Sequence, residues 1–501
     1  MVIIEQLEAM RSSGGAARTT GLSNDIIRRF AEQDPKLVEA VGDAAQIHQA
    51  LSTEMPEFLA LDEDRQIEVI QSDYVNFYSA DTVNPYVICA ARGPWIVTLK
   101  GAVLHDTGGY GMLGFGHAPE DILQAMNQSH AMANVMTPNI SQHRMIEALR
   151  KEIGQQREQG CPFEKFLCMN SGSEAMTVAA RISDVNAKLM TDPGGRYANN
   201  TIRAVGLKSG FHGRTDRPAQ FSDSTRQTYT RHLATFRDRD NLITVEPNDL
   251  EQLEQVFHYA DKNDMFIEAL FVEPVMGEGN PGLAITAEFY TLARQLTEQH
   301  GSLLIVDSIQ AGIRAHGLLS IVDYPGFEDL DPPDMESYSK ALNAGQYPLS
   351  VLAMTDRATA LYRKGIYGNT MTTNPRALDV ACAVLAGLTP EIRDNIRHMG
   401  QAFVDRFEQL AKEMPGIITK VQGTGLLFSV ELDSCRFKGF GTDSIEEYMR
   451  IKGVNVIHGG VNSLRFTPHF AVTDMELELI VDATRQALLA GPQKAAASEA
   501  A

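Results

Sequence analysis

Three short segments of the 501-residue chain carry side chains that suit one another for chemistry on a bound aldehyde. Lys340 follows an expected strand at 335–338, and Asp307 closes the apolar run 303–306. Upstream, residues 170–174 read Asn-Ser-Gly-Ser-Glu, between an apolar run and a helical pattern. A lysine amine, a carboxylate and a turn that binds phosphate are what a protein must supply to hold and use pyridoxal phosphate. Together and in this order, the segments favour an enzyme that depends on this cofactor.

The turn at 170–174 is typical of a helix N-terminus. Backbone N–H groups at such a terminus bind anions, and Gly172 permits a ligand to approach closely. The alternative is an ordinary cap, in which Ser171 or Ser173 caps the helix expected after it. Taken alone, the segment favours the cap.

Asp307 stands where a buried strand is expected to end. In open α/β sheets, ligands bind at the carboxyl ends of the strands. A carboxylate that faces a pyridine nitrogen keeps it protonated and makes the ring an electron sink, and Gln310 lies close enough in sequence to donate to the ring hydroxyl. The alternative, with about equal weight, is that Asp307 caps the following helix.

Lys340 also follows an expected strand. Because lysines are rarely buried without a partner, a lysine at this place suits a Schiff base with an aldehyde cofactor. The alternative is an exposed lysine that begins a loop, and without its neighbours in the argument the lysine favours that alternative.

The composition excludes several classes of protein. The chain has 44% hydrophobic and 22% charged residues, as ordinary globular proteins do. Its net charge of -20 argues against nucleic acid or an anionic membrane as a partner. The five cysteines are odd in number and lack C-x-x-C spacing, so we expect no metal and a cytoplasmic location. We expect no signal peptide, and no apolar run approaches the roughly 20 residues that span a bilayer.

In the middle of the chain, short apolar runs alternate with longer stretches of helical spacing. The runs 166–169, 269–272 and 303–306 have the continuous hydrophobicity of strands buried on both faces. The stretches 174–190 and 287–300 have helical spacing. This alternation predicts an α/β fold with a largely parallel sheet covered by helices.

The two ends of the chain differ from the middle. Residues 24–32 and 37–51 predict amphipathic helices, and 95–99 a strand. Near the C-terminus, helices expected at 390–413 and 474–489 flank two strand-like runs, which indicates a compact α+β domain. We therefore expect an N-terminal helical extension (1–80), a segment of the small domain and the active site (81–140), a large cofactor-binding domain (141–389), a C-terminal small domain (390–490) and a disordered tail (491–501).

Three further segments stand in the order of a known family: Phe-His-Gly-Arg-Thr at 211–215, Glu-Pro-Val-Met-Gly-Glu-Gly at 273–279, and Gly-Asn-Thr at 368–370 followed by Asn-Pro. With the first three, they make the chain resemble the class III (ω-amino acid) aminotransferases of pyridoxal phosphate fold type I, and in particular the ornithine, lysine and 4-aminobutyrate branch. The resemblance runs from about residue 95 to 486. It implies a large domain with a mainly parallel sheet between helices, plus a small α+β domain.

The resemblance also implies roles for the cofactor-binding residues. Lys340 would form the Schiff base, Asp307 would bind the pyridine nitrogen and Gln310 the ring hydroxyl. The remaining cofactor contacts would come from Phe211, stacked on the ring, from His212 beside it, and from Ser171, Gly172 and Ser173 around the phosphate. Thr370 would hold the phosphate of the neighbouring subunit. That role implies a homodimer with shared active sites and leaves a tetramer open.

The substrate-binding residues implied by the resemblance number four. Arg214 would pair with a substrate carboxylate, which suits a planar guanidinium. Arg465 resembles a second arginine that pairs with a glutamate at the position of Glu278, and this pair can open for a dicarboxylate. Tyr110 resembles a tyrosine that contacts the α-carboxylate, with a packed loop tyrosine as the alternative.

Two departures from the family pattern lie beside the expected cofactor. Ser308 stands where the family usually has a second acid, and residues 371–373 replace residues that are commonly aromatic and glycine. Substrate shape or reaction outcome could therefore differ, although no group that the core chemistry needs is missing.

The resulting functional expectation is transfer of an amino group from an ω-amino or diamino acid to a 2-oxo acid such as 2-oxoglutarate, with ping-pong kinetics. The freed Lys340 amine would move the proton between substrate and cofactor. The alternatives are an aminomutase, racemase or decarboxylase of the same fold and, more remotely, a non-catalytic protein that binds pyridoxal phosphate.

Overall fold

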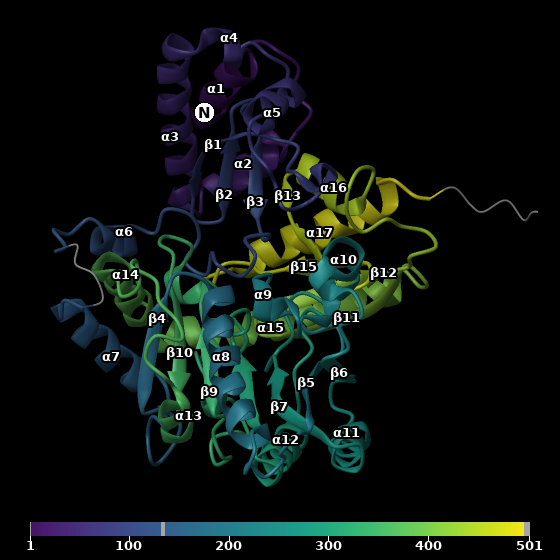
Figure 1. Cartoon of the computed structure of the whole chain (residues 1–501). Coiled ribbons are helices and arrows are strands. Elements are labelled where there is room, and N and C mark those ends of the chain that lie inside the picture. Colours follow the sequence, from purple (N-terminus) through teal and green to yellow (C-terminus); the bar gives the residue numbers. More distant parts are fainter. Residues whose placement is uncertain (1, 132–135, 495–501) are drawn as a thin grey trace, which may run out of the picture. The chain divides into compact units, whose positions relative to one another are not determined.

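The computed structural model describes residues 2–131 and 136–494, and the end of the expected tail, 495–501, lies outside the described residues. The chain divides into two compact units (Figure 1). Unit 1 comprises residues up to 120, 398–422 and from 428 onward, and unit 2 comprises 121–397 and 423–427. None of the helices in the described ranges is long and apolar enough to cross a membrane.

Unit 2 is built on a seven-stranded sheet with the order β4-β10-β9-β8-β7-β5-β6. The pairs β5–β6, β5–β7, β7–β8 and β8–β9 are parallel, and β10 runs antiparallel to both of its neighbours. The strands are β4 (Lys165–Met169), β5 (Thr201–Leu207), β6 (Leu242–Val245), β7 (Met265–Val272), β8 (Leu303–Asp307), β9 (Met335–Tyr338) and β10 (Ser350–Met354). The predicted α/β fold with a mainly parallel sheet is confirmed.

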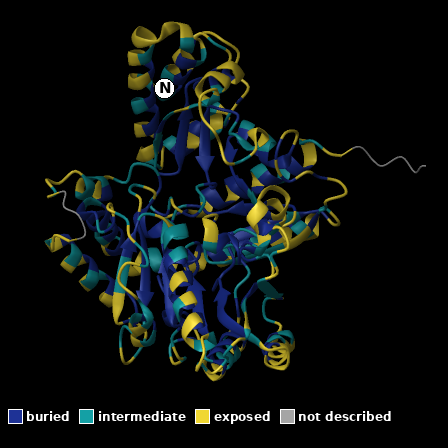
Figure 2. Ribbon diagram, in the orientation of Figure 1, coloured by how far each residue is buried: buried dark blue, intermediate teal, exposed yellow. Residues whose placement is uncertain are grey.

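Helices cover this sheet because its central strands β8, β9 and β10 are buried along their whole length. Helix α8 packs against β7, β9 and β10, and α11 and α12 pack near β6, β7 and β8. In Figure 2 the central strands are dark blue, whereas these helices also carry exposed residues, which are yellow. The helices of unit 2 are α6 (Glu120–Met126), α7 (Ile140–Glu152), α8 (Gly172–Thr191), α9 (Asp216–Ala219), α10 (Arg226–His232), α11 (Leu250–Lys262), α12 (Ala287–His300), α13 (Asp356–Leu361) and α14 (Pro375–Ala386).

Unit 1 contains two four-stranded sheets. The first has the order β1-β2-β3-β13 and the second β11-β12-β15-β14. Their strands are β1 (Ile88–Arg92), β2 (Trp95–Thr98), β3 (Val103–Asp106), β11 (Ile418–Thr424), β12 (Leu427–Leu432), β13 (Val454–Asn455), β14 (Ile457–Gly459) and β15 (Ser463–Phe466). The expected strand at 95–99 is β2, one residue shorter than expected.

The N-terminal helices belong to the core of unit 1. Phe30 and Trp95 are almost fully buried, with ring centroids 5.0 Å apart, and they share a hydrophobic cluster with Leu37 and Val103. The helices are α1 (Val2–Arg11), α2 (Asn24–Ala31), α3 (Pro35–Glu54), α4 (Pro56–Leu59), α5 (Glu63–Gln71), α16 (Ile445–Ile451) and α17 (Asp474–Ala490), and the residues of α15 (Pro390–Glu413) are divided between the two units.

Candidate active site

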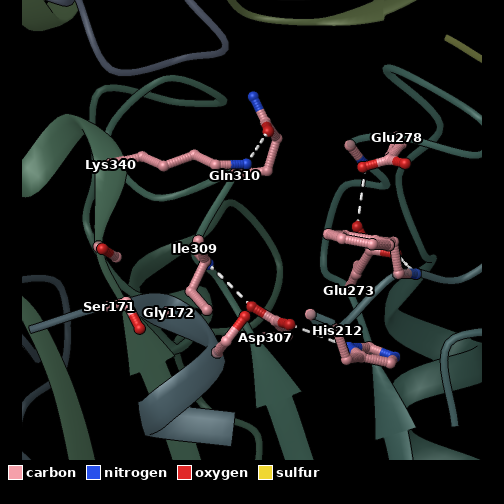
Figure 3. A pocket seen from close by; sticks show the side chains of 14 residues that line it. Ser171, Gly172, His212, Glu273, Glu278, Asp307, Ile309, Gln310 and Lys340 are labelled. Atoms are coloured by element: carbon pink, nitrogen blue, oxygen red, sulfur yellow. Dashed lines mark hydrogen bonds and ion pairs between the residues drawn. The ribbon is translucent and has the colours of Figure 1, made fainter. Parts of the chain in front are cut away.

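The carboxyl ends of β5, β7, β8 and β9 bring polar side chains together at one edge of the unit 2 sheet. Asp307 is the last residue of β8, Glu273 follows β7, and Lys340 comes two residues after β9. Because parallel strands end at the same edge, these residues meet in one pocket, as ligand sites of open α/β sheets do (Figure 3). The pocket is lined by Ser171, Gly172, Ser173, Phe211, His212, Gly213, Glu273, Gly277, Glu278, Asp307, Ile309, Gln310, Ser339 and Lys340.

Asp307 is held by groups on three sides. Its Oδ2 lies 2.9 Å from Nδ1 of His212, and its Oδ1 accepts hydrogen bonds from the Ile309 N–H at 3.1 Å and the Ser337 hydroxyl at 3.3 Å. Asp307 is 4% exposed and His212 is 2% exposed. A buried carboxylate with these fixed donors is preorganised to face a ring nitrogen.

His212 has one ring nitrogen bound and one without a partner. Its main-chain N–H donates to the Ser222 hydroxyl at 2.9 Å, and its ring lies against Phe221 and Phe271. Within the described part of the chain, Nε2 is buried and has no hydrogen-bond partner. Since Nδ1 faces Asp307, the imidazole holds that carboxylate in place from the side of the core.

Glu273 is a second buried carboxylate beside this pair. It accepts hydrogen bonds from the N–H groups of Phe211 and Gly277, both at 2.9 Å. Burial raises the pKa of Glu273 to about 7, and the charge of Asp307 adds to the rise, while His212 and the two N–H donors oppose it. The carboxyl therefore titrates near neutrality. The sequence analysis had not selected Glu273, although its place directly after a central strand is the same signal that marked Asp307.

Lys340 points into the pocket and its Nζ donates to Oε1 of Gln310 (Figure 3). The backbone of Lys340 has φ +45°, in the left-handed region that residues other than glycine seldom adopt. Such conformations cost about 1–3 kcal/mol and cluster at functional sites, because the surrounding fold must hold them in place. Here the strained backbone directs the amine toward Gln310.

The turn at 170–174 caps α8 and lines the same pocket. The hydroxyl of Ser171 accepts from the Glu174 N–H, and the Glu174 carboxylate accepts from the Ser171 N–H, which is a complete capping box. Gly172 and Ser173 are the first two residues of the helix, where N–H groups have no acceptor within the helix. The cap expected from the sequence is therefore present, and the capped helix N-terminus still offers N–H groups that could bind an anion.

Glycines keep the walls of the pocket close together. A Cβ on Gly213, which has φ +119°, would lie 2.5 Å from the Ser173 hydroxyl. A Cβ on Gly277 would lie 2.4 Å from Cγ of Gln310. Larger residues at these positions would displace the two side chains that flank the amine and the turn.

Besides capping α8, Glu174 binds a distant loop, a contact that the sequence did not predict. Its Oε1 accepts from the Tyr367 hydroxyl at 2.5 Å and from Nδ2 of Asn369 at 2.7 Å. The helix cap thereby fixes the loop that carries Thr370, which is itself exposed and does not line the pocket. No sequence pattern joins positions that are nearly 200 residues apart, so only the fold reveals this contact.

The substrate-binding residues expected from the sequence fall in both units. In unit 2, Nη2 of Arg214 lies 3.4 Å from Oε1 of Glu278, and its guanidinium carbon lies 5.3 Å from the Phe211 ring centroid. In unit 1, the guanidinium carbon of Arg465 lies 5.5 Å from the ring centroid of Tyr110. Burial raises the pKa of Tyr110 to about 12, and Tyr78 adds to the rise while Arg465 opposes it.

Ser308, where the family pattern has a second acid, lies beside a buried carboxyl group on β9. The Ser308 hydroxyl donates to Oε1 of Glu336 at 2.5 Å, and the Ile321 N–H donates to the same oxygen at 2.9 Å. Glu336 is fully buried, and burial raises its pKa to about 7, opposed by these donors and by Ser320. A carboxyl therefore still lies next to residue 308, one strand away from its usual place.

The fold and this site define the class of protein. A seven-stranded sheet with a single antiparallel strand, a lysine after β9, an aspartate at the end of β8 and a phosphate-type turn before α8 form the large domain of pyridoxal phosphate fold type I. Residues 77–488 match the class-III aminotransferase family. The chain belongs to this family and is a pyridoxal-phosphate-dependent aminotransferase.

Known relatives agree with this assignment. An acetylornithine aminotransferase of Neisseria meningitidis is 27% identical over 399 residues, covering 78% of this chain and 92% of the relative. An ornithine aminotransferase of Emericella nidulans is 26% identical over 456 residues, covering 86% of this chain and 92% of the relative. The crystal structure of the Toxoplasma gondii ornithine aminotransferase has the same fold, with a TM-score of 0.72 and 23% identity. The match covers 87% of this chain and 97% of that chain.

The pocket fits the cofactor of the family. The capped turn offers N–H groups for a phosphate, Asp307 is a buried carboxyl group that can face the pyridine nitrogen, and the Lys340 amine lies in the same pocket. Gly213 and Gly277 let Ser173 and Gln310 take their places in the pocket wall, because a Cβ at either position would clash with those side chains. Charge, donors and shape are therefore all suited to pyridoxal phosphate.

Proposed function

We propose that the protein transfers the amino group of an ornithine-like ω-amino or diamino acid to a 2-oxo acid such as 2-oxoglutarate, by a ping-pong mechanism. The observation that carries this proposal is the convergence of Lys340, Asp307 and the 171–173 turn on one pocket. The names of the relatives add support, because they act on ornithine and acetylornithine.

The cofactor-binding residues take the following roles in this proposal. Lys340 anchors the cofactor, Asp307 binds the ring nitrogen, and Gln310 binds the ring hydroxyl. Phe211 stacks on the ring, His212 positions Asp307, and the phosphate is held by Ser171, Gly172 and Ser173. The 2.9 Å contact between His212 and Asp307 supports the positioning role, since it leaves the aspartate little freedom.

Pyridoxal phosphate, when bound, withdraws electrons from the substrate carbon that loses its proton. Lys340 Nζ takes up the proton from the substrate carbon as a general base. It then gives the proton to the cofactor as a general acid. Gln310 accepts a hydrogen bond from the same Nζ, so it orients the amine when the lysine is free. The buried walls around Asp307 keep water from the carboxylate.

Four residues support the choice of substrate class. Arg214 binds a carboxylate of the substrate, and its Nη2 lies 3.4 Å from Oε1 of Glu278. Glu278 is also the proposed partner of Arg465, in a pair that opens for a dicarboxylate. Arg465 and Tyr110 form a cation–π pair in unit 1 and take part in binding the amino acid and the 2-oxo acid. A pocket with a switchable arginine suits two substrates that alternate.

We further propose that the enzyme is a cytoplasmic homodimer in which Thr370 contacts the cofactor phosphate of the neighbouring subunit. The exposed position of Thr370, on a loop held by Glu174, supports this role. The five cysteines are free thiols, which fits the location. The boundaries expected from the sequence, with a large domain at 141–389 and a small one at 390–490, are kept as part of this proposal.

The test is amino transfer by the purified holoenzyme. Ornithine, N-acetylornithine, lysine and 4-aminobutyrate are each supplied with 2-oxoglutarate, and glutamate is measured against consumed donor. One glutamate per donor, with parallel lines in double-reciprocal plots, is expected for at least one donor. Conversion of a donor without any 2-oxo acid would contradict the proposal and indicate an aminomutase, racemase or decarboxylase.

A further inference from the structure

Unit 1 contains a cluster of two histidines and a glutamate that takes no part in the proposed reaction. His105 lies on β3, His469 lies in the segment before α17, and Glu476 is in the first turn of α17. Nε2 of each histidine lies 2.8 Å from Oε1 of Glu476. Three segments of unit 1 thus present their polar atoms to one point.

The ligand-type atoms of the cluster are close together and shielded. One nitrogen from each ring and one carboxylate oxygen lie within 4.8 Å of one another. The His105 side chain is 0% exposed, that of Glu476 is 6% and that of His469 is 10%, so only the His469 side touches solvent. The ring of Trp95 closes the other side, with its centroid 5.1 Å from that of His105.

The carboxylate of Glu476 has no lysine or arginine as an ion-pair partner in the described ranges of the chain. Its Oε2 accepts from the N–H and hydroxyl of Thr473, both at 2.8 Å. Its Oε1 is contacted by the two imidazoles.

We propose that Nε2 of His105, Nε2 of His469 and Oε1 of Glu476 bind a divalent transition-metal ion of the zinc class. Two imidazole nitrogens and one carboxylate oxygen are a common zinc donor set, with a water molecule in the fourth position. The partly exposed His469 leaves a path for that water and for the ion.

Metal binding at these atoms needs both Nε2 atoms unprotonated, with the ring proton on Nδ1. In His105, Nδ1 is buried and, over residues 2–131 and 136–494, has no hydrogen-bond partner, so binding of the ion must outweigh both the lost Nε2–H to Oε1 hydrogen bond and a buried N–H without an acceptor. The ion would join β3 to the start of α17 within unit 1.

The sequence indicated no metal because cysteine spacing was its main signal. Positions 105 and 469 are more than 360 residues apart, and Glu476 reads as the N3 residue of a capping box with Thr473. Only the packing of β3 beside this helix start brings the second histidine to the glutamate.

The experiment titrates the holoenzyme with Co²⁺, whose absorption in a four-coordinate site differs from that of the hydrated ion, and then with Zn²⁺ as a competitor. We expect one Co²⁺ per chain and a higher melting temperature with Zn²⁺ than without it. In His469→Ala the affinity should fall at least about 10-fold. His143→Ala, which removes an exposed histidine of unit 2, should leave it unchanged.

Glu476→Gln is the second variant, since glutamine also satisfies a capping box and α17 should still form. It should weaken Co²⁺ binding as His469→Ala does. Two results would overturn the proposal: no stoichiometric Co²⁺ in the wild type, or equal binding in the wild type and both cluster variants. The first would leave a hydrogen-bond network only, and the second would indicate an adventitious surface site.

Discussion

Nδ1 of His212 lies 2.9 Å from Oδ2 of Asp307, and both side chains are buried beneath the pocket that Lys340 enters. The pair joins the loop after β5 to the end of β8, two strands that are separated in the sheet by β7. An aspartate held in this way keeps its carboxyl group at a fixed place in the pocket. In the proposed function, this contact positions the group that binds the ring nitrogen of the cofactor.

Replacing the carboxyl group of Asp307 should therefore lower the rate of amino transfer more than the stability of the fold. Asp307→Asn keeps the size of the side chain, and we expect kcat to fall at least about 100-fold, the usual effect of removing one preorganised electrostatic group. Single-turnover rates with a reactive donor measure the effect. A variant that keeps more than a third of wild-type kcat would contradict the role of Asp307.

The buried carboxyl of Glu273 predicts a pH dependence of stability. Its pKa is raised to about 7 in the folded protein from 4.5, so the folded state binds more protons between these values and stability falls as pH rises from about 4.5 to 7. Glu273→Gln removes this loss. Its stability relative to the wild type should rise over that interval by up to about 3 kcal/mol.

Urea unfolding of both proteins at pH 5 and pH 8 measures this difference. The pKa of Glu336 is raised in the same way, but Glu336 is present in both proteins, so its contribution cancels when their stabilities are compared. A relative stability that is the same at the two pH values would show that Glu273 is ionised throughout.

Because Glu336 on β9 lies beside Ser308, the acid that the family usually has at position 308 should destabilise this protein. Ser308→Glu would place a second carboxylate where the serine hydroxyl now donates to Glu336 at 2.5 Å. Uncompensated charge in a buried site costs about 3–5 kcal/mol, so the melting temperature should drop sharply. Adding Glu336→Gln should restore much of the loss, and a double variant as unstable as Ser308→Glu would contradict the explanation.

A glycine in the wall of the pocket predicts a selective effect on the cofactor. In Gly277→Ala the new Cβ would lie 2.4 Å from Cγ of Gln310, so Gln310 must move away from Lys340. We expect weaker binding of pyridoxal phosphate and slower turnover. The matched control is Gly42→Ala on α3, where nothing lies within 4 Å and alanine should stabilise the helix by about 0.5–1 kcal/mol. Unchanged cofactor affinity in Gly277→Ala would be the contradicting result.

The parts that sequence could predict are those set by local patterns. The helix expected at 390–413 is α15 with the same bounds, because its apolar positions repeat with helical spacing. Lys340, Asp307 and the 170–174 turn could be selected because each stands at an element boundary, and in parallel α/β folds the carboxyl-terminal boundaries meet.

The parts that sequence could not predict depend on contacts between distant segments. Glu174 meets Tyr367, and His105 meets Glu476, through packing that no short pattern records. Ser308 was judged as the loss of an acid, because the strand that supplies Glu336 is a neighbour in the sheet and not in the chain.

The proposed function is tested most directly by identifying the residue that holds the cofactor. The holoenzyme is reduced with borohydride and digested, and the peptide that carries the cofactor is sequenced by mass spectrometry. One labelled lysine per chain is expected, Lys340, and no label in Lys340→Ala. Label on another lysine of the wild-type protein, or none at all, would contradict it.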